Sequence, residues 1–205
     1  MRAAIPSALV LAVVAALGTA GCIRIGGEPS PATQHYVLSP VVEAPSNETA
    51  SRAVPPVIGV GPVTLPAYLD RPQIVSRPAP DRLEVTEFAQ WGEPLRNGVA
   101  RVVAINLARL LPDSRVITFP WRSTEEIAYQ VVLDIGQLDG PAGGRIALDA
   151  RWRVLDRSGS EVAAHVSRLS EPAGAGTTAA AMSRALGALS HDIARQLSTT
   201  ARRLP

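Results

Sequence analysis

The sequence predicts an α+β fold in which one antiparallel sheet is covered by two longer helices, all within a single domain. Residues 129–135, 145–156 and 161–169 alternate apolar and polar side chains and are separated by glycine-containing turns. This pattern is typical of antiparallel strands with one solvated face. Residues 88–112 and 177–199 instead repeat apolar side chains every three or four positions, as amphipathic helices do. Two such helices on one face of a sheet give a two-layer domain.

Composition narrows the kind of partner. Hydrophobic residues make up 46% of the 205-residue chain but aromatic residues only 4%, so the core must be built mainly from Val, Leu, Ile and Ala. The 20 basic residues are all arginines, the formal net charge is +2, and the arginines are scattered along the chain. A nucleic-acid-binding protein needs a clustered basic face, so nucleic acid is excluded as a partner.

Residues 1–21 have the pattern of a secretory signal. Arg2 precedes an apolar run at residues 8–17, which is shorter than the roughly 20 residues that span a bilayer. Small residues then lead to Cys22, the only cysteine in the chain. The arrangement resembles a bacterial lipobox, with Thr19 at the position where leucine is usual. The alternative is an ordinary signal peptide followed by an incidental cysteine.

The lipobox reading makes Cys22 a lipidation site. A single acyl chain anchors a protein only marginally, whereas two or more hold it firmly, and bacterial lipid-modified cysteines usually carry two or three. Residues 22–33 contain Gly, Pro and Ser, as a flexible tether would. Ile23 stands where an aspartate would favour inner-membrane retention in lipoproteins of enteric bacteria. That resemblance favours the outer membrane, with the domain facing the periplasm.

The mature domain is expected over residues 34–199, followed by a frayed tail at 200–205. The strands expected before residue 129 are shorter than the three alternating strands that follow, which are predicted to form an antiparallel meander. They are predicted at residues 34–38, 57–63, 73–77, 82–86 and 115–119, with the third and fourth forming a hairpin around residues 78–81.

The first long helix is expected to begin near Gln90 or Trp91. Pro94 and Glu93 would then lie in its first turn, where a proline loses no hydrogen bond and a negative charge suits the helix dipole. Pro112 would end the helix. Its apolar stripe comprises Leu95, Val99, Val102, Val103, Leu107 and Leu110.

Catalytic patterns do not emerge. His35, His165 and His191 lack a second ligand at metal-binding spacing, and His165 is expected on the outer face of its strand. Asp134 and Asp139 near a strand end suggest a carboxylate pair or, more simply, a solvated turn. No nucleophile elbow, zinc motif or phosphate-binding loop occurs in the sequence. The chain is therefore predicted to be neither an enzyme nor a metal- or cofactor-binding protein.

Three blocks carry a family resemblance. They are residues 58–77, residues 87–111 with the core Trp91-Gly92-Glu93-Pro94-Leu95, and the alternating residues 129–156. Together with the upstream lipobox and the strand at Tyr36, they resemble the PqiC (YmbA) family of ABC-type transport auxiliary lipoproteins. Gly92 replaces the more common alanine of the second block.

The resemblance implies a non-enzymatic subunit of a lipid transport system at the outer membrane. Family members work with MCE-domain proteins and often with an ABC transporter in the inner membrane. The implied role is to dock the MCE conduit and support envelope integrity, and a homo-oligomeric ring would suit such a platform. The alternative is a lipid- or solute-binding periplasmic lipoprotein that acts without an MCE partner.

Two of these blocks supply candidate partner-interaction residues. They are Tyr68, Asp70, Arg71, Trp91, Glu93 and Leu95. A purely structural interpretation stands beside this one. Trp91 would then cover the first turn of the helix, and Asp70 would pair with Arg71 or cap a turn.

Overall fold

The computed structural model describes residues 31–43, 55–122, 126–174 and 176–203. The predicted signal peptide 1–21, Cys22 and most of the tether 22–33 lie outside the described residues. The domain itself is the compact unit Thr33–Pro205. Among the described residues, no helix has the length and apolar character needed to cross a membrane.

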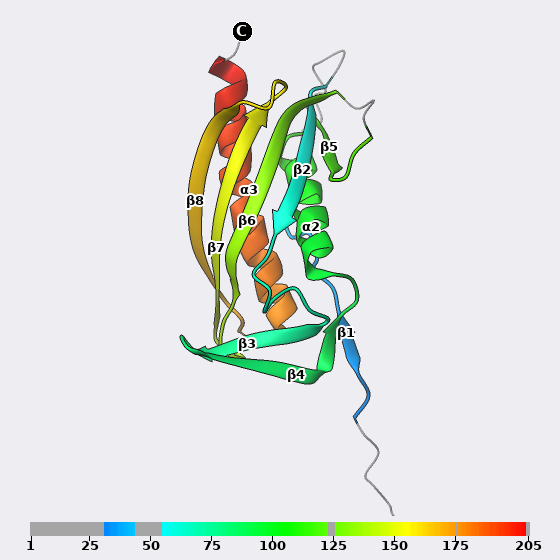
Figure 1. Cartoon of the computed structure of the whole chain (residues 1–205), viewed down its shortest axis with the longest axis vertical. Helices are drawn as coiled ribbons and strands as arrows, with labels where there is room; N and C mark the ends of the chain where they lie inside the picture. The colour runs from blue at the N-terminus through cyan, green and yellow to red at the C-terminus, as the bar shows by residue number, and fades with distance from the viewer. Residues whose placement is uncertain (1–30, 44–54, 123–125, 175, 204–205) are drawn as a thin grey trace, which may run out of the picture. The chain divides into compact units, whose positions relative to one another are not determined.

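A five-stranded sheet forms one layer of this unit (Figure 1). Its strands, in spatial order, are β5 (Arg115–Thr118), β2 (Val57–Thr64), β6 (Ile127–Asp139), β7 (Arg145–Asp156) and β8 (Glu161–Pro172). Strands β6, β7 and β8 pair antiparallel along nearly their whole length. The predicted meander is therefore confirmed, with β6 and β8 longer than their alternating patterns.

The rest of this sheet departs from the prediction. Strand β2 runs parallel to both of its neighbours, β5 and β6, so the sheet is mixed and not purely antiparallel. Parallel neighbours need a crossover connection, which is usually a helix. Helix α2 (Leu95–Leu110) lies between β2 and β5 in the chain and provides that crossover. The α+β class is confirmed, while the direction of β2 depends on a connection that the local pattern does not reveal.

Both helices lie on one face of this sheet (Figure 1). Helix α2 packs on β2 and β5, and α3 (Thr178–Arg203) packs on β7 and β8 and against α2. The predicted stripe of α2 is buried from Leu95 to Leu107, and Leu110 packs against the core. Helix α3 continues to Arg203, so residues 200–203 are helical and the predicted frayed tail is wrong there.

The register of β7 and β8 corrects the expected direction of the His165 side chain. His165 lies opposite Trp152, and their rings stack with centroids 4.7 Å apart. Because cross-strand partners point to the same face, His165 lies on the Trp152 side and not on the outer face. Val166 therefore points to solvent and is 50% exposed.

A three-stranded sheet lies across the lower end of the first one in Figure 1. Strands β3 (Gln73–Ala79) and β4 (Arg82–Trp91) form the predicted hairpin, and β1 (Gln34–Tyr36) pairs with β4 in parallel.

Strand β4 continues to Trp91, so the expected helix start at Gln90 or Trp91 is wrong. Helix α2 begins at Leu95, with Pro94 as its N-cap and no acid in its first turn. Proline disfavours helical geometry in the residue before it, which keeps Glu93 outside the helix.

Candidate functional site

Two loops meet in a groove beside the N-terminus of α2. One loop leads from Asp70 into β3, and the other leads from β4 into α2. The groove has a volume of about 310 Å³ and is called here the motif groove; its lining residues are Asp70, Arg71, Pro72, Trp91, Gly92, Glu93, Pro94 and Leu95. Five of the six predicted interaction residues are therefore brought together, and Tyr68 is the exception.

Backbone hydrogen bonds hold the two loops in place. The Trp91 N–H donates to the carbonyl of Pro72, with N and O 2.7 Å apart. The Gly92 N–H donates to the Tyr36 carbonyl at 2.8 Å. Strand β1 and the loop before β3 thus fix the end of β4, and the groove geometry follows from the three-stranded sheet.

The floor of the motif groove belongs to the hydrophobic core. Trp91 is 8% exposed and Leu95 is 2% exposed, and both are members of the core cluster. Trp91 is therefore packed in the core at the end of β4 and does not lie in the first turn of the helix, which begins at Leu95. Trp91 also lines the groove.

Each carboxylate in the motif groove has an arginine from α2. Asp70 accepts hydrogen bonds from Arg96, whose Nε lies 3.2 Å from Oδ1, so the expected pairing of Asp70 with Arg71 is wrong. Glu93 accepts from Arg101, with Nε 3.1 Å from Oε1. The Arg71 side chain donates to the amide oxygen of Gln73 at 3.2 Å, and no described carboxylate forms an ion pair with it.

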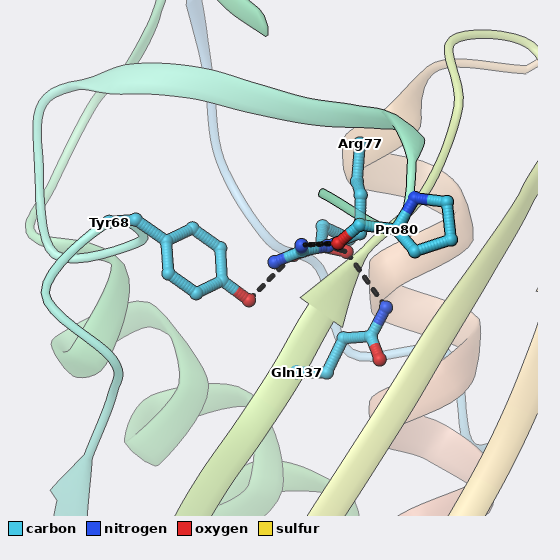
Figure 2. Close-up of polar contacts among 5 residues, drawn as sticks. Tyr68, Arg77, Pro80 and Gln137 are labelled. Atoms are coloured by element: carbon cyan, nitrogen blue, oxygen red, sulfur yellow. Dashed lines mark hydrogen bonds and ion pairs between the residues drawn. The ribbon is translucent and has the colours of Figure 1, made fainter. Parts of the chain in front are cut away.

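Tyr68 belongs to a different cluster, which is centred on Asp139 (Figure 2). Its hydroxyl donates to Asp139 Oδ2 at 2.7 Å. Arg77 from β3 donates to Oδ1 through Nε at 2.9 Å, and the Gln137 amide donates to Oδ1 at 2.9 Å. Burial, followed by the bond to Asp139, raises the pKa of Tyr68 to about 12. This cluster fastens the β3–β4 hairpin to the end of β6.

The sequence did not identify Asp139 as the centre of this cluster. Both interpretations of Asp134 and Asp139 are wrong, because the two residues lie in β6 and have separate partners. Asp139 is fully buried, whereas Asp134 is exposed and accepts from Thr64 Oγ1 at 3.0 Å. Arg77 lies 62 positions from Asp139 in the chain, so no local pattern could pair the two residues. The only signal in the sequence was an acidic residue next to an apolar strand.

The chain belongs to the family of ABC-type transport auxiliary lipoprotein components, whose model matches residues 36–194. This match includes both loops of the motif groove and confirms the family resemblance.

Solved structures show the same fold at low identity. An uncharacterised protein matches with a TM-score of 0.66 and 16% identity, over 82% of this chain and 99% of that one. Protein XCC0632 from Xanthomonas campestris matches with a TM-score of 0.62 and 17% identity, over 83% and 98% of the two chains. No protein of the curated set matches the chain.

Proposed function

We propose that this chain is a lipid-anchored, non-enzymatic docking subunit of an ABC-type transport system, and that the motif groove is its docking site. The observation that carries the proposal is the convergence of two sequence segments, residues 70–72 and 91–95, on one groove that is framed by backbone hydrogen bonds. The family match supports the transport-accessory role.

Cys22 is the proposed anchor. A diacylglyceryl group on its sulfur would tether the domain through residues 22–33 to the outer membrane, on the periplasmic face. The Ile23 position supports this destination. Replacing Cys22 with serine is expected to release the chain from the membrane fraction, and retention of this variant in membranes would argue against the anchor.

The proposed partner is an MCE-domain protein that connects to an ABC transporter and carries lipid between membranes. The groove suits docking better than catalysis, because both of its carboxylates are held by arginines and neither is left as an acid or base. A homo-oligomeric ring is a further part of the proposal and would place several such grooves around one conduit.

Capture from cross-linked membranes tests this function. The lipidated chain, recovered after cross-linking in cells, is expected to bring an MCE-domain protein with it. Deletion of the chain is expected to sensitise the envelope to detergent. Repeated recovery of the chain without any MCE-domain protein would sink the proposal.

A second candidate function is supported by a different cavity. A cavity of about 480 Å³ opens between the C-terminal ends of α2 and α3, and apolar side chains such as Ile58, Leu110, Leu111 and Leu197 line it. Its size is within the range of small-molecule sites. A lipid- or solute-binding lipoprotein without an MCE partner would co-purify with phospholipid, which mass spectrometry detects. A ligand-free domain would count against this alternative.

A further inference from the structure

We propose that the motif groove binds a carboxylate side chain on an extended, acidic and apolar segment of a partner protein. This inference rests on the proposed function, because it names the chemistry that the same groove recognises. Three features of the groove each favour an anionic acceptor, and its two acids are already paired.

The first feature is the indole N–H of Trp91. Trp91 is more than nine-tenths buried, yet its side chain donates to no described residue. No buried side-chain nitrogen or oxygen among the described residues lacks a hydrogen-bond partner, so this N–H remains in contact with solvent. Trp91 lines the motif groove, and we infer that an acceptor in the groove reaches this indole N–H. Indole is a donor only.

The second feature is the guanidinium of Arg71. This exposed side chain lines the groove and contacts only the neutral amide of Gln73 among the described residues. A guanidinium presents planar paired donors that match a carboxylate. The side chain therefore offers the groove one positive charge that is not spent on a neighbouring acid.

The third feature is the amino end of α2. This 16-residue helix begins at Leu95 with Pro94 as its N-cap, and no side chain caps it. Its first N–H groups and its dipole give the end a partial positive charge. Leu95, Pro94 and Trp91 all line the motif groove, so the start of the helix and Trp91 border the same space.

The acids of the groove do not cancel this preference. Asp70 is paired with Arg96 and Glu93 with Arg101. Counted with Arg71, these five side chains carry three positive and two negative charges, a net charge of +1. An incoming carboxylate therefore meets an excess of positive charge.

Size and lining favour a peptide over a folded element or a membrane. A volume of about 310 Å³ is at the small end of ligand sites and accepts only a few side-chain atoms. The floor of Pro72, Trp91, Pro94 and Leu95 is apolar. The backbone N–H groups of Trp91 and Gly92 already donate to carbonyl groups of the protein. Recognition of the partner therefore relies on side chains and on the end of the helix.

Nuclear magnetic resonance of the purified full chain, kept in a zwitterionic detergent, tests this inference. The indole resonance of Trp91 is assigned with the variant Trp91→Phe. Blocked leucyl-glutamyl-leucine is expected to shift this resonance saturably. The glutaminyl counterpart is expected to bind about tenfold more weakly, because one charge-assisted hydrogen bond is lost. Arg71→Gln should weaken glutamyl binding similarly, whereas the control Arg82→Gln on the hairpin should not.

Three results would overturn the inference. They are no shift with the glutamyl peptide, equal shifts with both peptides, and a shift produced only by phosphatidylglycerol vesicles. The proposed function fails separately, through membrane capture without an MCE-domain protein. A groove that binds the glutamyl peptide while capture fails would retain the groove chemistry and remove only the transport partner.

Discussion

Arg77 Nε lies 2.9 Å from Oδ1 of Asp139, whose side chain has no exposed surface. The arginine comes from the β3–β4 hairpin and the aspartate from the end of β6. The backbone N–H of Arg77 also donates to the Gly140 carbonyl, with N and O 2.8 Å apart. This pair therefore joins the two sheets and sets the position of the hairpin that frames the motif groove.

Removing Arg77 would leave a buried, uncompensated carboxylate. Arg77→Met is expected to lower the free energy of unfolding by about 3 kcal/mol, the cost typical of breaking a buried ion pair from one side. Urea denaturation measures the change. Arg82→Met is the control, because Arg82 and Glu84 are 65% and 56% exposed and such pairs contribute at most about 1 kcal/mol. Equal losses in the two variants would contradict the role of Asp139.

Tyr68 should make stability depend on alkaline pH. Burial first, and then the hydrogen bond to Asp139, raise its folded-state pKa from the usual value of about 10 to about 12. A raised pKa means that the folded state favours the protonated hydroxyl. This contribution is complete below pH 10 and is lost as the pH rises towards 12.

The variant Tyr68→Phe isolates this effect. Below pH 10 it is expected to be less stable than the natural chain by about 1.5–3 kcal/mol, the value of a hydrogen bond to a charged group. The difference in unfolding free energy should narrow between pH 10 and 12, because only the natural chain carries the hydroxyl at position 68. Denaturation across this range measures it, and a constant difference would be the contrary result.

Local patterns in the sequence were enough to predict some elements and not others. The alternation in β7 and the apolar stripe of α3 correctly predicted a strand and a helix, because a buried face imposes its period on the sequence of the element. The pairing of β1 with β4 joins segments more than 50 positions apart, and no local period encodes it. For the same reason the sequence predicts a helix start near Gln90 or Trp91, although both residues belong to β4.

The motif groove was predictable in composition but not in its electrostatics. The blocks around Asp70 and Trp91 stood out as residue patterns, and the structure brings them together. The partners of their acids come from the first two turns of α2, namely Arg96 and Arg101. These pairings depend on the angle at which the helix leaves the groove, which the sequence does not display.

Trp91 should be needed for folding as well as for lining the groove. Trp91→Ala is expected to cost about 3–5 kcal/mol, as for other buried large-to-small changes. Trp91→Phe should cost about 1–2 kcal/mol, since most of the ring volume remains. Denaturation in urea compares them. A loss below about 1 kcal/mol for the alanine variant would show that the ring is not part of the core.

Gly92 should accept an alanine, the residue that the family resemblance leads us to expect at this position. A Cβ there would meet Val37 Cγ1 at 3.1 Å, and the exposed Val37 side chain has room to turn. Gly92→Ala is expected to change the unfolding free energy by less than about 1 kcal/mol.

Gly140→Ala provides the contrast. A Cβ at Gly140 would lie 2.0 Å from the carbonyl oxygen of Arg145, and backbone cannot move aside cheaply. A loss of at least about 3 kcal/mol is expected, as for severe overpacking. Thermal unfolding of both variants checks the pair, and a sensitive Gly92 with a tolerant Gly140 would contradict the model of the two turns.

Photocross-linking from the motif groove in living cells tests the central claim most directly. A photoreactive phenylalanine analogue replaces Arg71 in one strain and Arg82, on the hairpin surface, in another. Docking through the groove predicts a cross-link to a component of the transport system from position 71 and none from position 82. Equal cross-linking from both positions, or none from position 71 in a folded, membrane-bound chain, would contradict it.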